Sequence, residues 1–454
     1  MFRKVLVANR GEIAQRIIRA CHAVGAKAVA VYSEGDVGSP HLEEADETVC
    51  LGPAPSAQSY LDQDALLQAA IQMECQAIHP GYGFLSENAQ FARRCTQQKL
   101  VFIGPLAESI EKMGDKANAR ETMKAAGLPV MPGSDDLVHT VAEAKVLAEE
   151  FGYPVLLKAT AGGGGKGMRR VDDESGVEKA FNDAAREAEK SFGNADLYLE
   201  KFIVGGRHIE FQVLADHYGN VVHLGERECS IQRNHQKLIE EGPANGLDPS
   251  VRTELGERIR EAVRTIGYRN AGTIEFLMDA SGSLYFMEMN TRIQVEHPVT
   301  ELITGVDLVA WQLRIASGEK LTLQQEDIEW TGHAIELRIN AEDPSQGFRP
   351  APGLVETFSV PTDVEGATVR LDSHVRPGYK IPTHYDSMIG KLLVHADTRE
   401  QAVAALRSVI DRVEIVGVPT TLPLHAAILA EADFASGNYN CQYLLDHPDV
   451  LGGT

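Results

Sequence analysis

Short apolar runs alternate with amphipathic stretches of helical period through about the first 105 residues of the chain. The runs expected to form strands are residues 4–8, 27–32, 77–78 and 101–103. Between the first two, residues 12–24 place Ile13, Ile17 and Ile18 on one helical face. Strands separated by helices pair in parallel, because a parallel connection needs a crossover of about a dozen residues. Residues 1–112 are therefore predicted to form a parallel α/β domain.

The remaining chain carries different signals. A Gly- and Pro-rich break at residues 127–133 follows a helical stretch, and residues 113–132 are predicted to be a linker. Residues 133–203 form a small block of short strands and two helices. Residues 204–454 are rich in hairpin signals, such as His-Tyr-Gly-Asn at 217–220 between two strand-like runs. We expect a mixed or antiparallel C-terminal domain, so that the whole chain combines α/β and α+β architecture.

Charge and cysteine usage exclude some classes of function. The chain has 43 Lys and Arg residues against 65 Asp and Glu residues, a net charge of −22. Such a surface repels phosphate backbones and anionic lipids, so neither nucleic acid nor a membrane is an expected partner. The six cysteines form no CxxC pair, which favours free thiols in a reducing compartment. No apolar run reaches ~18 residues and the N-terminus does not resemble a signal peptide, so a cytoplasmic location is predicted.

The segment Thr160-Ala-Gly-Gly-Gly-Gly-Lys-Gly-Met168 has five glycines within six residues, between two predicted strands. Successive glycines let backbone N–H groups approach an anion closely, and Lys166 adds positive charge. The segment matches neither the Walker A nor the dinucleotide-binding pattern. It can be a flexible surface linker or a lid over phosphates. We favour the lid, with Lys158 at the end of the preceding strand as a further phosphate ligand.

The hairpin at residues 273–290 predicts a metal site. If Ser281-Gly282 is a two-residue turn, Glu275 lies directly opposite Glu288, with Cβ atoms about 5 Å apart. A divalent cation would remove the repulsion, and Asn290 on the same face completes an oxygen set that suits Mg²⁺ or Mn²⁺. The alternative is an ordinary hairpin with one polar, solvent-facing side. The opposite side is apolar throughout, namely Ile274, Phe276, Met278, Met287 and Met289.

Polar residues continue to alternate after this hairpin, and the row then ends at His297-Pro298. Its members are Glu288, Asn290, Arg292, Gln294 and Glu296. Arg292 can bind a small oxyanion and Glu296 can act as a general base. If the strand stays extended, Glu296 lies about 13 Å beyond Arg292, well away from the metal end. We interpret the row as the floor of an active site.

Three other polar features have ordinary interpretations when taken alone. The donor-rich segment 226–237 reads as a surface loop. His208 reads as a hydrogen-bonded structural histidine, and Arg338 as a surface arginine or a member of a structural ion pair.

Taken together, six motifs resemble biotin carboxylase, the ATP-grasp component of biotin-dependent carboxylases, and above all the stand-alone bacterial subunit of acetyl-CoA carboxylase. The resemblance covers the chain end to end. It implies a three-lobed ATP-grasp fold in which residues 133–203 are a lid. The motifs are the glycine segment, Ala8-Asn-Arg-Gly-Glu-Ile-Ala14, His79-Pro-Gly-Tyr-Gly-Phe-Leu-Ser-Glu-Asn88, Met113-Gly-Asp-Lys116, Glu288-Met-Asn-Thr-Arg-Ile-Gln-Val-Glu-His-Pro298 and Tyr385-Asp-Ser-Met-Ile-Gly-Lys391.

The resemblance assigns roles to individual residues. It implies that Glu275, Glu288 and Asn290 hold magnesium or manganese. The residues implied to bind ATP are Lys116, Lys158, Gly162, Gly163, Gly164, Gly165, Lys166, Gly167, Glu200, Lys201, Ile203, His208, Gln232 and His235. The residues implied to bind bicarbonate or biotin are Tyr82, Lys237, Arg292, Gln294, Val295, Glu296 and Arg338. Among these, Lys237, Arg292, Glu296 and Arg338 would be catalytic, with Glu296 as the base.

The implied reaction is the ATP-dependent carboxylation of biotin by bicarbonate through carboxyphosphate, in the pathway to malonyl-CoA and fatty acids. No Ala-Met-Lys-Met tetrapeptide occurs, so biotin is expected on a separate carrier protein, with carboxyltransferase subunits as further partners. A homodimer is also implied, although residues 360–367 and Ala23 depart from the usual contact region. Elsewhere in the chain, Ala161 and Asn234 also depart from the family pattern. Two rivals are another ATP-grasp ligase and a non-catalytic nucleotide-binding regulator. The sequence does not identify the final acyl acceptor.

Overall fold

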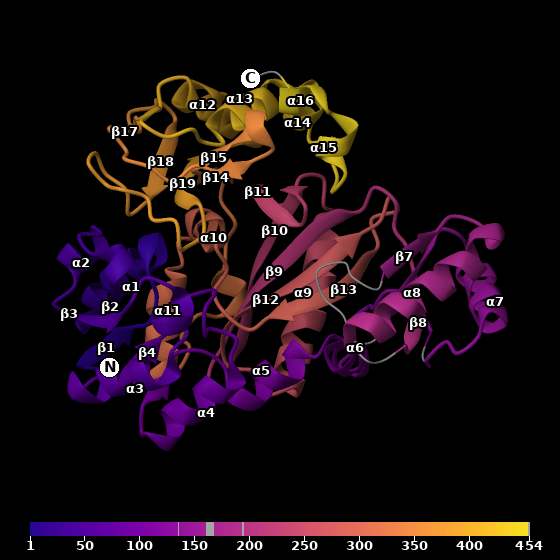
Figure 1. Cartoon of the computed structure of the whole chain (residues 1–454), viewed down its shortest axis with the longest axis horizontal. Helices are drawn as coiled ribbons and strands as arrows, with labels where there is room; N and C mark the ends of the chain where they lie inside the picture. The colour runs from indigo at the N-terminus through magenta and orange to yellow at the C-terminus, as the bar shows by residue number, and fades with distance from the viewer. Residues whose placement is uncertain (135, 160–167, 193–194, 453–454) are drawn as a thin grey trace.

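The computed structural model describes residues 1–134, 136–159, 168–192 and 195–452, arranged as in Figure 1. The N-terminal domain contains a five-stranded parallel sheet in the order β3-β2-β1-β4-β5, which confirms the predicted parallel architecture. The strands are β1 (Lys4–Val7), β2 (Lys27–Ser33), β3 (Glu47–Gly52), β4 (Ala77–His79) and β5 (Val101–Phe102). The helices are α1 (Gly11–Ala23), α2 (His41–Glu44), α3 (Gln63–Gln72), α4 (Ala89–Gln97) and α5 (Ala107–Gly114).

The segment after this sheet is helical and packed. The boundary expected at residue 112 falls inside α5, and α6 (Lys116–Ala125) occupies the expected linker. On α6, Ala119 and Met123 are buried in the same core cluster as Phe211 and Phe286 of the large sheet. This packing holds the start of α6 beside the sheet that carries the candidate site.

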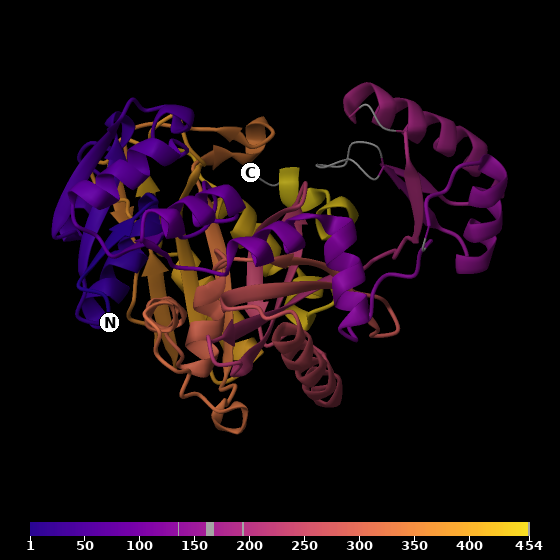
Figure 2. The same cartoon turned by 90° about the horizontal axis from the view of Figure 1, so that it is seen from below.

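The small lobe is a three-stranded antiparallel sheet in the order β7-β6-β8, and it stands to one side in Figure 2. Its elements are α7 (Val141–Phe151), β6 (Val155–Ala159), β7 (Met168–Val171), α8 (Val177–Phe192) and β8 (Leu197–Lys201). Val155, Leu157 and Leu199 pack against Ala144 and Ala148 of α7. The alternation of buried and half-buried residues along β6 leaves Lys158 on the face away from this core. The glycine segment, with Gly162 to Gly167 and Lys166, lies outside the described residues.

An eight-stranded antiparallel sheet forms the centre, in the order β13-β12-β9-β10-β11-β14-β19-β18. Its strands are β9 (Arg207–Ala215), β10 (Val221–Arg233), β11 (Gln236–Gly242), β12 (Asn270–Met278), β13 (Leu284–Asn290), β14 (His333–Asn340), β18 (Ala367–Asp372) and β19 (Met388–Ala396). The mixed or antiparallel C-terminal domain is thereby confirmed.

Helices and two small sheets complete the C-terminal part. The helices are α9 (Pro249–Thr265), α10 (His297–Thr304), α11 (Leu308–Ala316), α12 (Arg399–Ile410), α13 (Leu422–Ala430), α14 (Ala432–Ser436), α15 (Tyr443–Asp446) and α16 (Asp449–Gly452). The small sheets pair β15 (Glu342–Asp343) with β16 (Arg349–Pro350) and β17 (Thr357–Ser359) with β20 (Glu414–Val416). One core cluster contains Ile17 of α1, Leu313 of α11 and Leu214 of β9, so the N-terminal domain is fixed against the central sheet. Among the described residues, no helix is long and apolar enough to cross a membrane.

The predictions for segment 226–237 and for the strand after Asn290 are wrong. Segment 226–237 is not a surface loop, because it supplies most of β10 and the start of β11 within the sheet. Its polar residues obscure the strand, because successive side chains such as Glu226, Arg227 and Glu228 are buried against charged partners on other elements. The extended strand expected to reach Glu296 ends at Asn290, and α10 begins at His297. Pro298 favours this helix start, because proline fits the first turn.

Candidate active site

Four charged side chains form a row across neighbouring strands of the large sheet. Glu275 on β12 is paired with Glu288 on β13 and with Glu210 on β9. Glu210 is paired in turn with Arg227 on β10. Paired residues share a face of the sheet, so the row presents three carboxylates and one guanidinium side by side. Glu210, Glu275 and Arg227 are buried, and such a concentration of charge needs compensation nearby.

The facing pair Glu275 and Glu288 is confirmed, although the turn from which it was predicted is wrong. The Asp279 N–H donates to the Ser283 carbonyl over 2.9 Å, so the turn spans residues 280–282. The register then shifts by one residue, which leaves Phe286 opposite Phe276. The extra residue is Met287, which is 42% exposed and does not join the apolar face. This bulge offsets the longer turn and restores the expected register at the two carboxylates.

One ammonium group holds three carboxylates together. Lys237 Nζ donates to Glu210 Oε2 (2.6 Å), Glu275 Oε1 (3.1 Å) and Glu296 Oε1 (2.6 Å). Burial alone would lower the pKa of Lys237, but the carboxylates reverse this and raise it well above its usual value. His208 Nε2 lies 3.0 Å from Glu275 Oε2. Burial would raise the pKa of Glu275, whereas Lys237 and His208 hold that pKa below its usual value.

Glu296 lies at the metal end of the row, and the prediction that it lies well beyond that end is wrong. Since the chain leaves the extended conformation after Asn290, Glu296 turns back and shares Lys237 with Glu275. Its other oxygen, Oε2, accepts from Arg338 Nη2 over 2.8 Å. The residue has 0% exposure, and burial would raise its pKa. Lys237 and Arg338 outweigh burial and hold the pKa of Glu296 well below its usual value.

Arg338 on β14 is an ion-pair member within the cluster and not a surface arginine. Its Nε donates to Glu240 Oε1 over 2.5 Å, while Nη2 binds Glu296. Tyr82 donates its hydroxyl to Glu12 Oε1. Burial and Glu12 raise the pKa of Tyr82 well above its usual value, and Arg338 is close enough to oppose that shift. The charge of Arg338 thus acts on the Tyr82 hydroxyl, although the two residues come from different domains.

Arg292, Asn290 and Gln294 form a second group beside Glu275. Arg292 Nη2 donates to Asn290 Oδ1 over 3.0 Å, and Nη1 donates to Gln294 Oε1 over 2.8 Å. The amide nitrogens of Asn290 and Gln294 both donate to Glu275 Oε1, over 2.8 and 2.9 Å. Arg292 Nε also donates to Glu87 Oε2 over 2.9 Å. The alternating polar residues therefore do gather, although they do so through a turn and not along a strand.

Some candidate nucleotide ligands lie around the metal end of the row. Lys116 Nζ lies 3.0 Å from Glu288 Oε2, with its side chain 70% exposed. His208 contacts Glu275, which places it in the cluster at the metal end. Gln232 Nε2, on β10, donates to Sγ of Cys441, which lies just before α15, over 3.2 Å. His235 is exposed at the β10–β11 turn, in a left-handed conformation with φ of +64°.

Other candidates belong to the small lobe and its hinge. Lys158 Nζ donates to Glu200 Oε2 across β6 and β8. Lys201 Nζ instead donates to the carbonyls of Gly152 and Tyr153, over 2.6 and 3.1 Å. Ile203 is partly exposed just after β8, where the chain enters β9. The structure thus brings Lys158 and Glu200 together, and the Lys201 ammonium turns towards the lobe's own backbone.

The residues present fit a divalent cation. Glu275 and Glu288 are directly paired, and carboxylates at that spacing repel unless a positive charge lies between them or beside each one. In this structure Lys237 and Lys116 supply the compensation separately. Glu288 is partly exposed, so its oxygens are accessible to an incoming ion. Hard oxygen ligands of this kind favour Mg²⁺ or Mn²⁺.

Glu210, Arg227 and Glu87 were not anticipated as members of the site. Glu210 and Arg227 are both fully buried, and Arg227 Nε donates to Glu210 Oε1 over 2.7 Å. The signal for Glu210 was present, because His208, Glu210 and Gln212 alternate with apolar residues along β9. Glu87 carries no such local signal, since its contact with Arg292 joins segments 205 residues apart.

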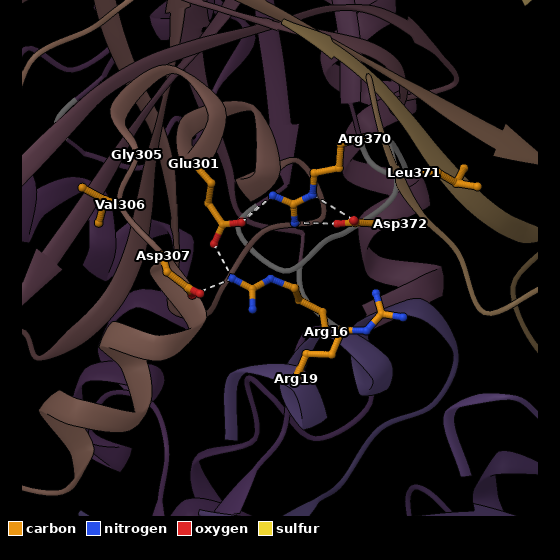
Figure 3. A pocket seen from close by; sticks show the side chains of 9 residues that line it. All are labelled: Arg16, Arg19, Glu301, Gly305, Val306, Asp307, Arg370, Leu371 and Asp372. Carbon is orange, nitrogen blue, oxygen red and sulfur yellow. Dashed lines mark hydrogen bonds and ion pairs between the residues drawn. The ribbon is translucent and has the colours of Figure 1, made fainter. Parts of the chain in front are cut away.

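A polar pocket of about 490 Å³ lies elsewhere, between α1, the end of α10 with residues 305–307, and β18. Figure 3 shows its charged side chains paired across it. Arg16 Nη2 donates to Glu301 Oε1 (2.7 Å) and Asp307 Oδ1 (2.5 Å), and Arg370 Nη1 donates to Glu301 Oε2 (2.8 Å). None of the predicted site residues lines this pocket.

The parallel N-terminal sheet, the small antiparallel lobe and the carboxylate row on the large sheet together define an ATP-grasp enzyme. Three family descriptions match the chain in sequence: biotin carboxylase, N-terminal domain, at residues 1–110; carbamoyl-phosphate synthase L chain, ATP binding domain, at 115–324; and biotin carboxylase C-terminal domain, at 336–446. The chain belongs to the biotin carboxylase family, whose members are ATP-dependent ligases.

Known relatives cover nearly the whole chain. Biotin carboxylase 1, chloroplastic, of Populus trichocarpa is 53% identical over 448 residues, covering 99% of this chain and 84% of the relative. The biotin carboxylase of Nostoc sp. is 52% identical over 443 residues, covering 98% of each. A solved biotin carboxylase domain dimer of the Hydrogenobacter thermophilus 2-oxoglutarate carboxylase, in complex with MgADP, ADP and bicarbonate, has 51% identity and a TM-score of 0.90 over 99% of each chain.

Proposed function

We propose that this enzyme uses ATP and bicarbonate to carboxylate biotin on a carrier protein, as the first half-reaction of a biotin-dependent carboxylase. The observation that carries the proposal is the shared ammonium of Lys237, which joins Glu275 to Glu296. A carboxylate suited to a metal–nucleotide complex and a carboxylate suited to a base thus belong to one cluster, with Arg292 beside it. Phosphoryl transfer from ATP to a small oxyanion needs these groups close together.

The nucleotide is assigned to the metal end of the row. Glu275, Glu288 and Asn290 would hold magnesium, which when bound neutralises charge on the phosphates. Lys116, His208, Gln232 and His235 would contact the nucleotide from the central domain. Within residues 133–203, Lys158 and residues 162–167 would contact the phosphates of the nucleotide. Glu200, Lys201 and Ile203 would lie beside the adenine. We divide the chain into four segments: 1–112, 113–132, 133–203 and 204–454. Residues 133–203 would act as the lid.

Bicarbonate is assigned to the space beside Arg292, with Gln294 and the Val295 backbone as further ligands. Glu296 has a depressed pKa because Lys237 and Arg338 donate to it, so it is a weak base in this state. A bicarbonate that takes Lys237 as its own partner removes one of those donors. The pKa of Glu296 then rises, and the carboxylate accepts the bicarbonate proton as the anion attacks the γ-phosphate.

The second step is the carboxylation of biotin. Carboxyphosphate breaks down to carbon dioxide and phosphate, and the phosphate trianion removes the proton from biotin N1′. The resulting enolate attacks carbon dioxide, which forms the N–C bond of carboxybiotin. Arg338 would stabilise the enolate oxygen, and Tyr82 from the N-terminal domain would contact the biotin ring. The Tyr82 hydroxyl donates to Glu12, which contacts Lys391, the strand partner of Arg338, and this chain of contacts supports a biotin site at this end of the cluster.

Acetyl-CoA is our proposed final acceptor, which would place the enzyme in fatty acid synthesis. The sequence resemblance to the acetyl-CoA carboxylase subunit supports this, whereas a relative of 51% identity is the small subunit of a 2-oxoglutarate carboxylase. We further propose a cytoplasmic homodimer that works with a biotin carboxyl carrier protein and carboxyltransferase subunits. The carboxyltransferase that co-purifies with the protein identifies the acceptor, and a transferase specific for a 2-oxo acid would overturn the acetyl-CoA assignment.

The test of the proposed function is ATP turnover under four conditions: no addition, bicarbonate, biotin, and both together. We expect the two compounds together to stimulate ADP release well above either one alone. ATP hydrolysis that is indifferent to both would overturn the proposal and favour a nucleotide-binding regulator. Stimulation by a different small carboxylate would favour another ATP-grasp ligase.

A further inference from the structure

Lys391, at the end of the motif Tyr385-Asp-Ser-Met-Ile-Gly-Lys391, has no role in the reaction as described so far. It lies on β19 as the direct partner of Arg338 on β14 and of Asp372 on β18. Its side chain therefore lies on the same face of the sheet as the Arg338 guanidinium. Lys391 has 0% exposure, and lysine is almost never fully buried unless it is paired.

The Lys391 ammonium connects two segments that carry opposite ends of the site. Nζ donates to the Val295 carbonyl over 2.8 Å and lies 3.1 Å from Glu12 Oε1. The same Glu12 oxygen accepts the Tyr82 hydroxyl. Val295 precedes α10, Glu12 lies on α1, and Tyr82 follows β4. A chain of three polar contacts thus runs from the backbone between Gln294 and Glu296 to the tyrosine of the N-terminal domain.

The alternative is that Lys391 only neutralises buried carboxylates. Glu12, Glu336 and Asp372 do raise its pKa, against the effect of burial. Charge neutralisation does not require a bond to a main-chain carbonyl, however, and this bond lies at the one residue between Gln294 and Glu296. Both neighbours contact the central cluster, Gln294 through Glu275 and Glu296 through Lys237. A shift of the Val295 carbonyl would therefore move both side chains.

We propose that Lys391 is a positioning residue, which through Val295 fixes the bicarbonate-binding backbone and through Glu12 fixes the distance from that backbone to Tyr82. This inference rests on the proposed function and deepens it. The ammonium acts as a spacer between the bicarbonate end, built on α10 and the segment before it, and the biotin end, built on the N-terminal domain. Neither Lys391 nor Glu12 touches a substrate in this account.

The proposed spacer role predicts that substitutions at Lys391 and Glu12 change the KM values for bicarbonate, biotin and MgATP to different extents. Lys391→Met releases the Val295 carbonyl, and we expect the KM for bicarbonate to rise about tenfold to a hundredfold, the scale of a small misplacement of reacting groups. The KM for MgATP should stay within about twofold, because Lys391 contacts none of the nucleotide candidates among the described residues. Glu12→Gln keeps the bond to Val295 and loosens Tyr82, so it should raise the KM for biotin more than that for bicarbonate.

Controls separate positioning from folding. Arg399→Met removes another buried cation, which pairs with Glu241 away from the site, and it should lower thermal stability without changing either KM. If Lys391→Met does not fold, the double variant with Glu12→Gln decides, because it also removes the Glu12 charge that Lys391 neutralises. We expect that variant to show both raised KM values.

The outcomes are distinct. An unchanged KM for bicarbonate in folded Lys391→Met, or in the double variant, would overturn the positioning role. An equal rise in the KM for MgATP would do the same, and so would an unchanged KM for biotin in Glu12→Gln. A wild-type enzyme whose ATP cleavage ignores bicarbonate would instead refute the proposed function itself.

Discussion

Replacing Glu296 with glutamine removes one proton acceptor and preserves nearly all of the surrounding geometry. The amide oxygen can still accept from Lys237, which also keeps Glu210 and Glu275 as partners. Arg338 loses a charged acceptor and keeps Glu240. A hydrogen bond to a charged group is worth about 1.5 to 3 kcal/mol, and this sets the expected loss of stability.

The loss of rate should be larger than the loss of stability suggests. General-base assistance is typically worth about 10² to 10⁴ in rate, which is about 3 to 5 kcal/mol in activation free energy. A glutamine cannot take the bicarbonate proton, so bicarbonate-dependent ATP cleavage should fall by that factor. The affinity for MgATP should change little, because Glu296 binds Lys237 and Arg338 and, within the part of the chain that the structure describes, no candidate nucleotide ligand.

The assay compares ADP release with and without saturating bicarbonate, together with a separate titration of MgATP binding. Glu241→Gln is the matched control, because Glu241 is equally buried and is paired with Arg399 and His333. That variant should lose stability and keep the bicarbonate response. If Glu296→Gln cleaves ATP at the wild-type rate in the presence of bicarbonate, Glu296 is not the base. The role would then pass to another group beside Arg292.

Two further substitutions test the charges around the site. Glu288→Gln should severely weaken the use of MgATP, because a neutral amide binds the metal poorly. The free energy of unfolding should change by less than about 0.5 kcal/mol, since the present partner of Glu288, Lys116, is largely exposed. An unchanged metal requirement with unchanged activity would refute the assignment of Glu288 as a metal ligand. Glu240 has a pKa of about 7, raised from 4.5 chiefly by burial, so its contribution to stability is present below pH 4.5 and is lost as the pH rises through 7. The glutamine of Glu240→Gln has no proton to lose. Between pH 5 and pH 8, chemical denaturation should therefore show the free energy of unfolding of this variant rising relative to that of the wild type by up to about 3 kcal/mol. A difference between the two proteins that does not depend on pH would contradict this.

The local periodicity of the sequence predicted the elements that carry the site. Alternation of apolar and polar residues located β12 and β13, and the facing of Glu275 and Glu288 followed from it. That agreement depended on two compensating features, a longer turn and a bulge at Met287, which residue spacing alone does not reveal. The same logic applied to β9 would have added Glu210 to the row.

Other parts of the site depend on long-range packing, which the sequence does not encode locally. The polar row from Asn290 to Glu296 continued the strand pattern, yet its side chains gather because the chain turns into α10. Arg338 belongs to the site because β14 lies next to β11 in the large sheet, a pairing that local sequence patterns do not reveal. Glu87 and Glu12 reach the cluster from the N-terminal domain, and their positions depend on how that domain packs against the central sheet.

The transfer of label from bicarbonate to biotin is the most direct test of the proposed activity. The purified chain would be incubated with labelled bicarbonate, free biotin, Mg²⁺ and ATP, and the acid-labile label on biotin would be measured. We expect labelled carboxybiotin to form only when all four are present, with at most one carboxyl group transferred for each ADP released. ATP cleavage without any transfer of label to biotin, under conditions in which the enzyme is folded and binds MgATP, would contradict the account.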